Sequence, residues 1–171
     1  MPRPIPGLKA RAISAGGYHS LVVSTAGAVL AFGEGDHGKL GLGDTASRST
    51  PTQIAGLPPV KVVSAGDEHS LFLAVDGRVY SAGYPGNGQL GLGHFNDVRD
   101  PTLVEGFGAT PKSRSTADAD NDGSSDAKAG DRPKFRMPKV EKLVCGAFHS
   151  MVVTQAKTKS AGKDYHKLWT F

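Results

Sequence analysis

The sequence predicts an all-β fold built from repeated four-stranded antiparallel sheets, and two observations lead to this prediction. The first is an internal repeat: residues 14–21 (SAGGYHSL) recur at 64–71 (SAGDEHSL) and at 144–151 (VCGAFHSM). The second is that short apolar runs alternate with glycine-rich turns, without the 3.6-residue periodicity of an amphipathic helix. Four-stranded sheets repeated around an axis form a β-propeller, so we expect part of a propeller.

The spacing of the repeats divides the chain. His19 and His69 are 50 residues apart, whereas His69 and His149 are 80 apart, which indicates an insertion. We therefore expect two propeller repeats in residues 1–107, at about 7–56 and 57–106. Residues 108–138 are predicted to be a low-complexity, disordered insertion, because small and charged residues dominate them. Residues 139–171 form the first half of a third repeat.

Each complete repeat is expected to contain four short strands, which the second repeat shows best. They are predicted at residues 60–65, 69–75, 78–82 and 101–104. The second strand is apolar at nearly every position, as expected where neighbouring sheets cover both faces. Asp76-Gly77 predicts a type I′ hairpin turn, since both residues tolerate positive φ. Pro101 suits an edge strand, where a missing N–H costs no ladder bond.

Both ends of the chain are predicted to lie in incomplete blades. Residues 4–8 resemble residues 54–57, so we expect them to be the outer strand of a blade completed elsewhere. Residues 168–171 match the return strands at 29–32 and 79–82, so the third blade is expected to be truncated. Propellers close with about four to eight blades. The open faces therefore predict a chain that is marginally stable, aggregation-prone or paired with further blades.

The composition excludes several classes of protein. Cys145 is the single cysteine, which excludes an internal disulfide and a cysteine-rich zinc site. The first twenty residues lack a signal-peptide core and no apolar run reaches membrane-spanning length, so we expect an intracellular protein of the cytoplasm or nucleus, without membrane contact. The net charge is +4, but residues 155–167 hold four lysines against Asp164. The basic character is thus local, which weakens the case for nucleic-acid binding.

A longer motif runs through both complete repeats. After A-G-x-x-H-S and a hairpin come residues 38–43 (GKLGLG) or 88–93 (GQLGLG), and then P-x-x-V or a close variant. This pattern resembles the regulator-of-chromosome-condensation repeat, whose members form seven-bladed propellers. The first repeat departs from it at Lys39, where glutamine is usual, and the third hairpin is about nine residues longer. A kelch propeller shares the period, but its paired glycines followed by spaced Tyr and Trp are missing.

The functions that this resemblance implies are diverse. The founding member is a chromatin-bound exchange factor for the small GTPase Ran, and relatives include domains of ubiquitin ligases, ciliary proteins and plant UV-B photoreceptors. A shared propeller does not fix function. We expect a non-enzymatic protein-interaction module without a cofactor, whose partner is a protein such as a small GTPase or a ubiquitin-pathway protein. The alternatives are nucleotide exchange on a Ran-like GTPase and binding to chromatin or nucleic acid.

The repeated histidines and glycines are predicted to be structural. Equivalent positions in successive blades sit apart around a ring, so the imidazoles should not converge on a metal, and each ring is expected to bond a neighbouring backbone group. The adjacent serines lack a nucleophile elbow and a His–carboxylate partner, so no catalytic residue is expected. These structural positions are Gly16, His19, Gly66, His69, Gly146 and His149.

Two segments are candidates for contact with a partner. The glycine-rich loops at 33–38 and 83–88 lack the features of a P-loop, so they are predicted to be blade turns with polar tips on one rim. The lengthened basic hairpin at 155–167 could reach phosphate or an acidic protein surface, or it could be a solvated loop. The candidate residues are Asp36, His37, Tyr84 and Asn87 in the loops, and Lys157, Lys159, Lys163, Tyr165, His166 and Lys167 in the hairpin.

A calcium site and a light-sensing role are both disfavoured. Residues 118–126 match part of an EF-hand loop, but Ala129 falls where a bidentate glutamate is needed, and no amphipathic helix flanks the segment. Trp169 is a lone tryptophan, and we expect it to be packed within a strand.

Overall fold

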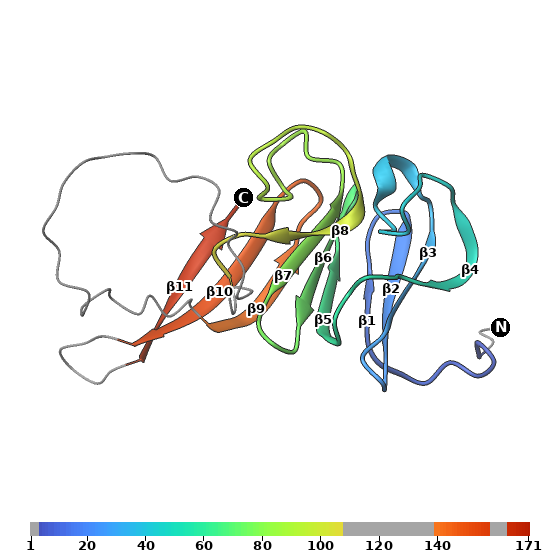
Figure 1. Cartoon of the computed structure of the whole chain (residues 1–171), viewed down its shortest axis with the longest axis horizontal. Coiled ribbons are helices and arrows are strands. Elements are labelled where there is room, and N and C mark those ends of the chain that lie inside the picture. The colour runs from blue at the N-terminus through green and yellow to red at the C-terminus, as the bar shows by residue number, and fades with distance from the viewer. Residues whose placement is uncertain (1–3, 108–138, 158–163) are drawn as a thin grey trace, which may run out of the picture.

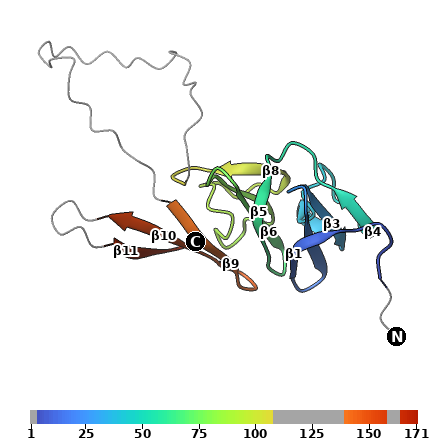
Figure 2. The same ribbon diagram turned by 90° about the horizontal axis from the view of Figure 1, so that it is seen from below.

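The computed structural model describes residues 4–107, 139–157 and 164–171, which form three antiparallel sheets standing side by side (Figures 1 and 2). The first two sheets have four strands each, in the orders β1-β2-β3-β4 and β5-β6-β7-β8, and the third has the order β11-β10-β9. This confirms the predicted all-β fold of four-stranded antiparallel blades. The predicted insertion at 108–138, with its calcium-loop match, lies outside the described residues.

The strands follow the predicted order along the chain. The first blade contains β1 (Ala10–Ala15), β2 (His19–Ser24), β3 (Val29–Gly33) and β4 (Arg48–Gln53); the second contains β5 (Val60–Ala65), β6 (His69–Ala74), β7 (Val79–Gly83) and β8 (Val98–Val104); the third contains β9 (Lys139–Cys145), β10 (Ser150–Lys157) and β11 (Asp164–Thr170). One 3₁₀ turn, η1 (Asp36–Gly38), precedes β4. In the described part of the chain, no helix is long and apolar enough to cross a membrane.

The apolar core lies between neighbouring blades. Leu21 and Val23 of β2 pack with Phe72 and Ala74 of β6 in one cluster. Leu71 of β6, on the opposite face of the same strand, belongs to a second cluster shared with the third blade. Because side chains alternate along a strand, β6 is buried over its whole length. The prediction that blades cover this strand on both faces is therefore confirmed.

The hairpin between the second and third strands differs from the prediction. Gly77 N–H donates to the Ala74 carbonyl at 3.0 Å, and only Gly77 has a positive φ, of 92°. A type I′ turn also needs a positive φ at Asp76, so that prediction was wrong, and the loop is a longer one closed by a left-handed glycine. The first blade forms the same loop without an Asp-Gly pair, with Gly27 at φ 86°.

Residues 4–8 do not form the predicted outer strand. Leu8 N–H donates to the Ile5 carbonyl at 3.4 Å and Gly7 has a φ of 74°, which makes a turn. No described strand pairs with this segment, so its backbone lacks the ladder partners that a strand requires. The segment instead lines the outer face of the first blade.

The repeated glycines allow the blades to approach each other. A β-carbon built on Gly66 would lie 2.6 Å from His69 Nδ1 and 2.7 Å from the carbonyl oxygen of Gly146 in the third blade. The missing side chain thus makes room for the histidine ring within the blade and for the backbone of the next blade.

We expect Gly66→Ala to lower the free energy of unfolding by on the order of 3 kcal/mol, because overpacking a closed junction forces side-chain and backbone shifts. Gly17→Ala is the matched control. A β-carbon there would meet first the Asp67 carboxylate, at 2.8 Å, and this flexible side chain can move away. Neither glycine has a positive φ. Urea denaturation measures both variants, and equal losses would contradict the packing argument.

Candidate functional site

The longest loops that the structure describes in full gather at one end of the blades. Because the strands are antiparallel, the β1–β2 and β3–β4 connections lie at the same end, and the second and third blades repeat this arrangement (Figure 1). We call this end the rim; it comprises residues 16–18, 34–47, 66–68, 84–97 and 146–149. The β2–β3, β6–β7 and β10–β11 hairpins lie at the opposite end.

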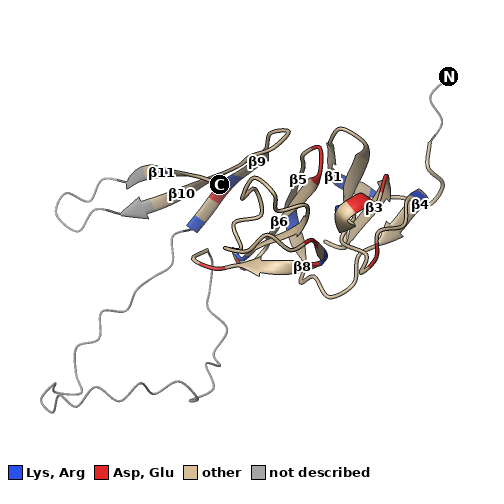
Figure 3. Cartoon of the chain, turned by 90° about the horizontal axis from the view of Figure 1, so that it is seen from above, with Lys and Arg blue, Asp and Glu red and all other residues tan. Residues whose placement is uncertain are grey.

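The rim is acidic although the whole chain is basic. Its loops contain six carboxylates and one lysine, a net charge of −5, whereas the chain carries +4. Figure 3, viewed from this end, shows acidic segments along these loops. The six are Glu34, Asp36, Asp44, Asp67, Glu68 and Asp97. Asp44 pairs with Arg48 at the start of β4, with 2.7 Å between Oδ2 and Nη2. Glu34 and Glu68 pair with Lys39, so these three carboxylates contribute less to the surface field than the other three.

The single rim lysine is buried between two blades. The Lys39 side chain has no exposed area, and its Nζ lies 2.7 Å from Glu34 Oε2 and 2.8 Å from Glu68 Oε2. Burial alone would lower the pKa of Lys39, but its hydrogen bonds to the two carboxylates outweigh burial and raise that pKa. Lys39 therefore joins blade 1 to blade 2 as an ammonium. The sequence identified it only as a departure from the repeat.

The second blade has a neutral residue at the matching position. Gln89 is fully buried, and its Oε1 accepts a hydrogen bond from Asn87 N–H at 2.8 Å. Its Nε2 has no hydrogen-bond partner among the described residues. Asn87 itself, a predicted contact residue, is exposed on the loop tip.

The structure brings two of the predicted contact residues together. The rings of His37 and Tyr84 have centroids 4.7 Å apart, so the long loops of the first two blades touch. His37 Nδ1 also lies 3.0 Å from Asp97 Oδ2, and both side chains are partly exposed. Asp36 is exposed at the start of η1. Sequence reasoning missed Asp97 because it follows the glycine-rich tip from which the candidates were chosen.

The repeated histidines bond serines of the next blade. His19 Nε2 lies 2.8 Å from Ser70 Oγ, and that hydroxyl donates to the Lys39 carbonyl at 2.6 Å. His69 makes the same contact with Ser150, at 2.9 Å. The prediction that each ring bonds a backbone group was therefore wrong. A hydroxyl has one proton, which the carbonyl receives, so the histidine Nε2–H is the donor to serine.

This arrangement also bears on chemistry at the serines. Ser70 and Ser150 are fully buried and commit their protons to carbonyl oxygens. A histidine that donates to a serine cannot act as its base, so the pairs serve to join blades. Among the described residues, no three His, Cys, Asp or Glu side chains lie close enough to hold a metal ion. The three structural glycines each precede a repeated histidine by three residues: Gly16 precedes His19, Gly66 precedes His69 and Gly146 precedes His149.

No sheet in the described part of the chain lies against the third histidine. His149 is exposed, whereas His19 is 3% exposed and His69 has no exposed area. The three imidazoles thus occupy equivalent places in different environments.

The described residues of the basic hairpin, 155–157 and 164–167, lie towards the end opposite the rim. His166 Nε2 is 3.0 Å from Glu141 Oε2, and Lys167 is exposed on β11. The backbones of Lys157 and Tyr165 lie in paired strands, while Lys159 and Lys163 fall outside the described residues. Contact between this hairpin and a partner stays a prediction.

Trp169 is partly packed within the third blade. Its Nε1 donates to Thr154 Oγ1 at 3.0 Å, and its ring meets Phe107 edge-on at 5.8 Å.

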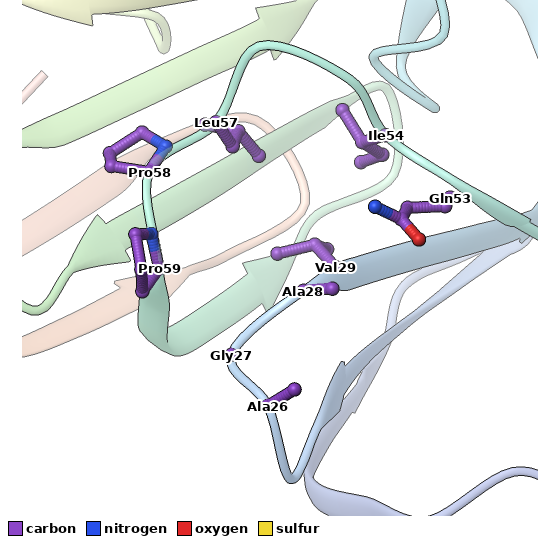
Figure 4. A pocket seen from close by; sticks show the side chains of 9 residues that line it. All are labelled: Ala26, Gly27, Ala28, Val29, Gln53, Ile54, Leu57, Pro58 and Pro59. Carbon is purple, nitrogen blue, oxygen red and sulfur yellow. The ribbon is translucent and has the colours of Figure 1, made fainter.

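A small hollow lies between the β2–β3 hairpin and the segment that leads to β5 (Figure 4). Its volume is about 190 Å³, and Ile54, Leu57 and two prolines line it. Gln53 is the one lining residue with a polar side chain, and none of the lining residues is charged. We assign no ligand to it.

Comparison with known proteins identifies the repeat. The model of the regulator of chromosome condensation (RCC1) repeat matches residues 26–73 and 76–117, and a second model of this repeat matches residues 10–39 and 60–89. This chain belongs to the RCC1 repeat family. The resemblance drawn from the histidine and glycine motifs is thus confirmed.

Relatives of this RCC1-repeat chain include large proteins. It is 40% identical over 64 residues to the RCC1 domain-containing protein RUG3, mitochondrial, of Arabidopsis thaliana, covering 36% of this chain and 14% of that protein. It is 47% identical over 51 residues to the E3 ubiquitin-protein ligase MYCBP2 of Danio rerio, covering 30% of this chain and 1% of the ligase. The chain therefore spans a small part of these relatives.

Solved RCC1-like structures share its fold. Prp20p from Saccharomyces cerevisiae superposes with a TM-score of 0.64 at 22% identity, over 92% of this chain and 33% of Prp20p. Human WBSCR16 gives a TM-score of 0.63 at 19% identity, over 92% of this chain and 36% of that protein. At this identity the likeness establishes the fold alone.

Proposed function

We propose that this chain is a non-enzymatic protein-binding module whose acidic rim binds a lysine- or arginine-rich segment of another protein. The observation that carries the proposal is the charge of the rim: six carboxylates face one lysine, and that lysine is buried. Complementary charge guides association and selects partners of opposite sign. Asp36 and Asp97 are exposed, and Asp67 is partly exposed, so they are available to a partner.

The relatives support a protein partner. The structure of Prp20p was described together with its binding to Gsp1p and histones, and a second structure shows yeast RCC1 bound to Kap60. The ligase relative suggests a partner in the ubiquitin pathway. Among these, a basic protein fits the charge of the rim.

A synthetic lysine- and arginine-rich peptide tests the proposal by fluorescence anisotropy. Replacing Asp36 and Asp67 with asparagine is expected to weaken binding several-fold and to make it less dependent on salt, because exposed charges act through a screened field. The control replaces two carboxylates at the opposite end, by Asp76→Asn and Glu105→Gln. Absent binding, or equal weakening by both pairs of changes, would refute the role of the rim.

Nucleotide exchange on a Ran-like GTPase is the second candidate function. The likeness to Prp20p, which is described as binding Gsp1p, favours it. An exchange factor stabilises the nucleotide-free state of its GTPase, so it must bind that state more tightly than the nucleotide-bound one. Accelerated release of labelled GDP from Ran in the presence of this chain would support exchange. Unchanged release would exclude exchange by this chain and leave the binding module.

A further inference from the structure

Two sheet faces of the described chain are not covered by another sheet. The outer face of the first blade, which we call the head face, forms a groove of about 480 Å³ that Ile13, Ser20 and Val22 help to line. The outer face of the third blade, which we call the tail face, carries His149 and Leu168. Ile13 is 76% exposed and Leu168 is 63% exposed.

The head and tail faces match the two sides of the junctions inside the chain. On the head face, Ile13, Ser20 and Val22 stand 50 residues before Val63, Ser70 and Phe72, which face blade 1. The turn at residues 5–8 also matches residues 54–57, and Ile54 and Leu57 pack into the first junction.

The tail face repeats the other side of the junction. His149, Met151 and Val153 occupy the places that His19, Leu21 and Val23 hold in blade 1, where all three are buried against blade 2. Leu168 matches Val29, which is also buried there. The two uncovered faces are thus the complementary halves of a contact that the chain already makes twice.

The hydrogen bond at the centre of each junction identifies the missing pair. Within the chain, a histidine Nε2 meets a serine Oγ of the following blade at 2.8 and 2.9 Å. The histidine without such a serine is His149, and the equivalent serine without a preceding histidine is Ser20. The His149 ring already rests against Gly146, as the His69 ring rests against Gly66. It is therefore positioned as in a formed junction.

We propose that the tail face of one copy of this chain binds the head face of a second copy, with His149 Nε2 donating to Ser20 Oγ of the second copy. Head and tail are different surfaces, so the contact is heterologous, and such contacts form a ring when the rotation closes. Two copies, each with two four-stranded sheets and one three-stranded sheet, would give a ring of six sheets, within the range of about four to eight blades known for propellers.

This junction is weaker than those within the chain. The hydroxyls of Ser14 and Ser64 accept hydrogen bonds from Ala65 N–H and Cys145 N–H of the next blade, at 3.0 and 2.8 Å. Val144 occupies the corresponding place on the tail face and cannot accept one. Association between copies is therefore reversible and depends on concentration.

Sedimentation velocity of the 171-residue chain at tens of micromolar tests the proposal with one variant for each face. Ile13→Asp blocks the head and Leu168→Asp blocks the tail, and both side chains are exposed enough for the fold to tolerate the change, which circular dichroism verifies. Each variant alone is expected to be monomeric. The equimolar mixture is expected to form dimers again through the intact tail of one and the intact head of the other, with lower affinity than the unchanged chain.

The control is Phe95→Asp, which alters a side chain that is 77% exposed on a rim loop and belongs to neither face. This variant is expected to dimerise like the unchanged chain. A monomeric unchanged chain would overturn the proposal. So would dimers of either face variant alone, which would indicate a symmetric contact, a mixture that stays monomeric, or aggregation that neither face variant reduces.

Discussion

The chain is expected to lose about 5 kcal/mol of stability as the pH falls from 6.5 to 4, because two buried histidines must remain neutral in the folded state. The pKa of His19 and of His69 is lowered from 6.5 to about 4, chiefly by burial, and the nearby charge of Lys39 contributes to the lowering at His19. In both rings Nε2–H already donates to a serine, and Nδ1 has no hydrogen-bond partner among the described residues. A proton added there would be buried without an acceptor.

The sign of this effect follows from the proton balance. Between pH 4 and 6.5 the unfolded chain binds protons at these histidines and the folded chain does not, so stability rises with pH across that window and is complete above it. Each histidine contributes about 3.5 kcal/mol in total, at roughly 1.4 kcal/mol for each pKa unit, and about 2.5 kcal/mol of this is lost between pH 6.5 and 4. The carboxyl groups of Asp44 and Asp76 titrate below this window, because hydrogen bonds with Arg48 and Arg78 lower their pKa values from 3.8.

Urea denaturation at a series of pH values measures the effect. The control is the double variant His19→Asn and His69→Asn, which is less stable at neutral pH but should show a much smaller dependence of stability on pH between 4 and 6.5. If the double variant keeps the slope of the unchanged chain, the histidines are not its source.

Replacing Glu34 and Glu68 together by glutamine is expected to lower the free energy of unfolding by about 3 kcal/mol, because the buried Lys39 ammonium loses both counterions. The effect lies at the lower end of the range for broken buried ion pairs, since the two carboxylates are themselves 39% and 28% exposed. Urea denaturation at pH 7 measures this loss.

Adding a third substitution, Lys39→Gln, is expected to restore much of the stability that the double variant loses. Adding Lys39→Gln to the double variant removes the stranded charge and gives the first junction the residue that the second blade has at Gln89. Asp44→Asn is the matched control, because it breaks an exposed pair with Arg48 and should lower the stability much less than the double change. A double variant no less stable than this control, or a Lys39→Gln change that deepens the loss, would show that the ion pairs do not hold the blades.

The blades could be predicted from the sequence because their signals are local. Strands, glycine loops and the edge proline are each encoded within one repeat, and repetition made them recognisable. The turn at Gly77 was mispredicted because the Asp-Gly pair was matched to a two-residue loop, although the strands end earlier and leave a longer one. The strand predicted at residues 4–8 is absent from the structure. A strand needs a neighbouring strand to pair with, and the local sequence does not show whether one is present.

The junctions were harder to predict, because their partners come from different repeats. His19 finds its acceptor 51 residues away, on the next blade. For Lys39, a signal was present: where the second repeat has Gln89, the places of Glu34 and Glu68 are taken by Tyr84 and Phe148. A charged residue that changes together with two carboxylates indicates contact, but the pattern becomes clear only when the blades are known to be neighbours.

The direction of the bonds from histidine to serine has a consequence for how such a chain can lengthen. Each blade has a histidine donor on one face and a serine hydroxyl on the other. A duplicated repeat inserted between two blades could therefore form the histidine–serine hydrogen bond with both of its neighbours. The boundary after the first blade is the exception. A repeat inserted after the first blade would need a carboxylate at the position equivalent to Glu68. Without it, the ammonium group of Lys39 would keep only one counterion, Glu34.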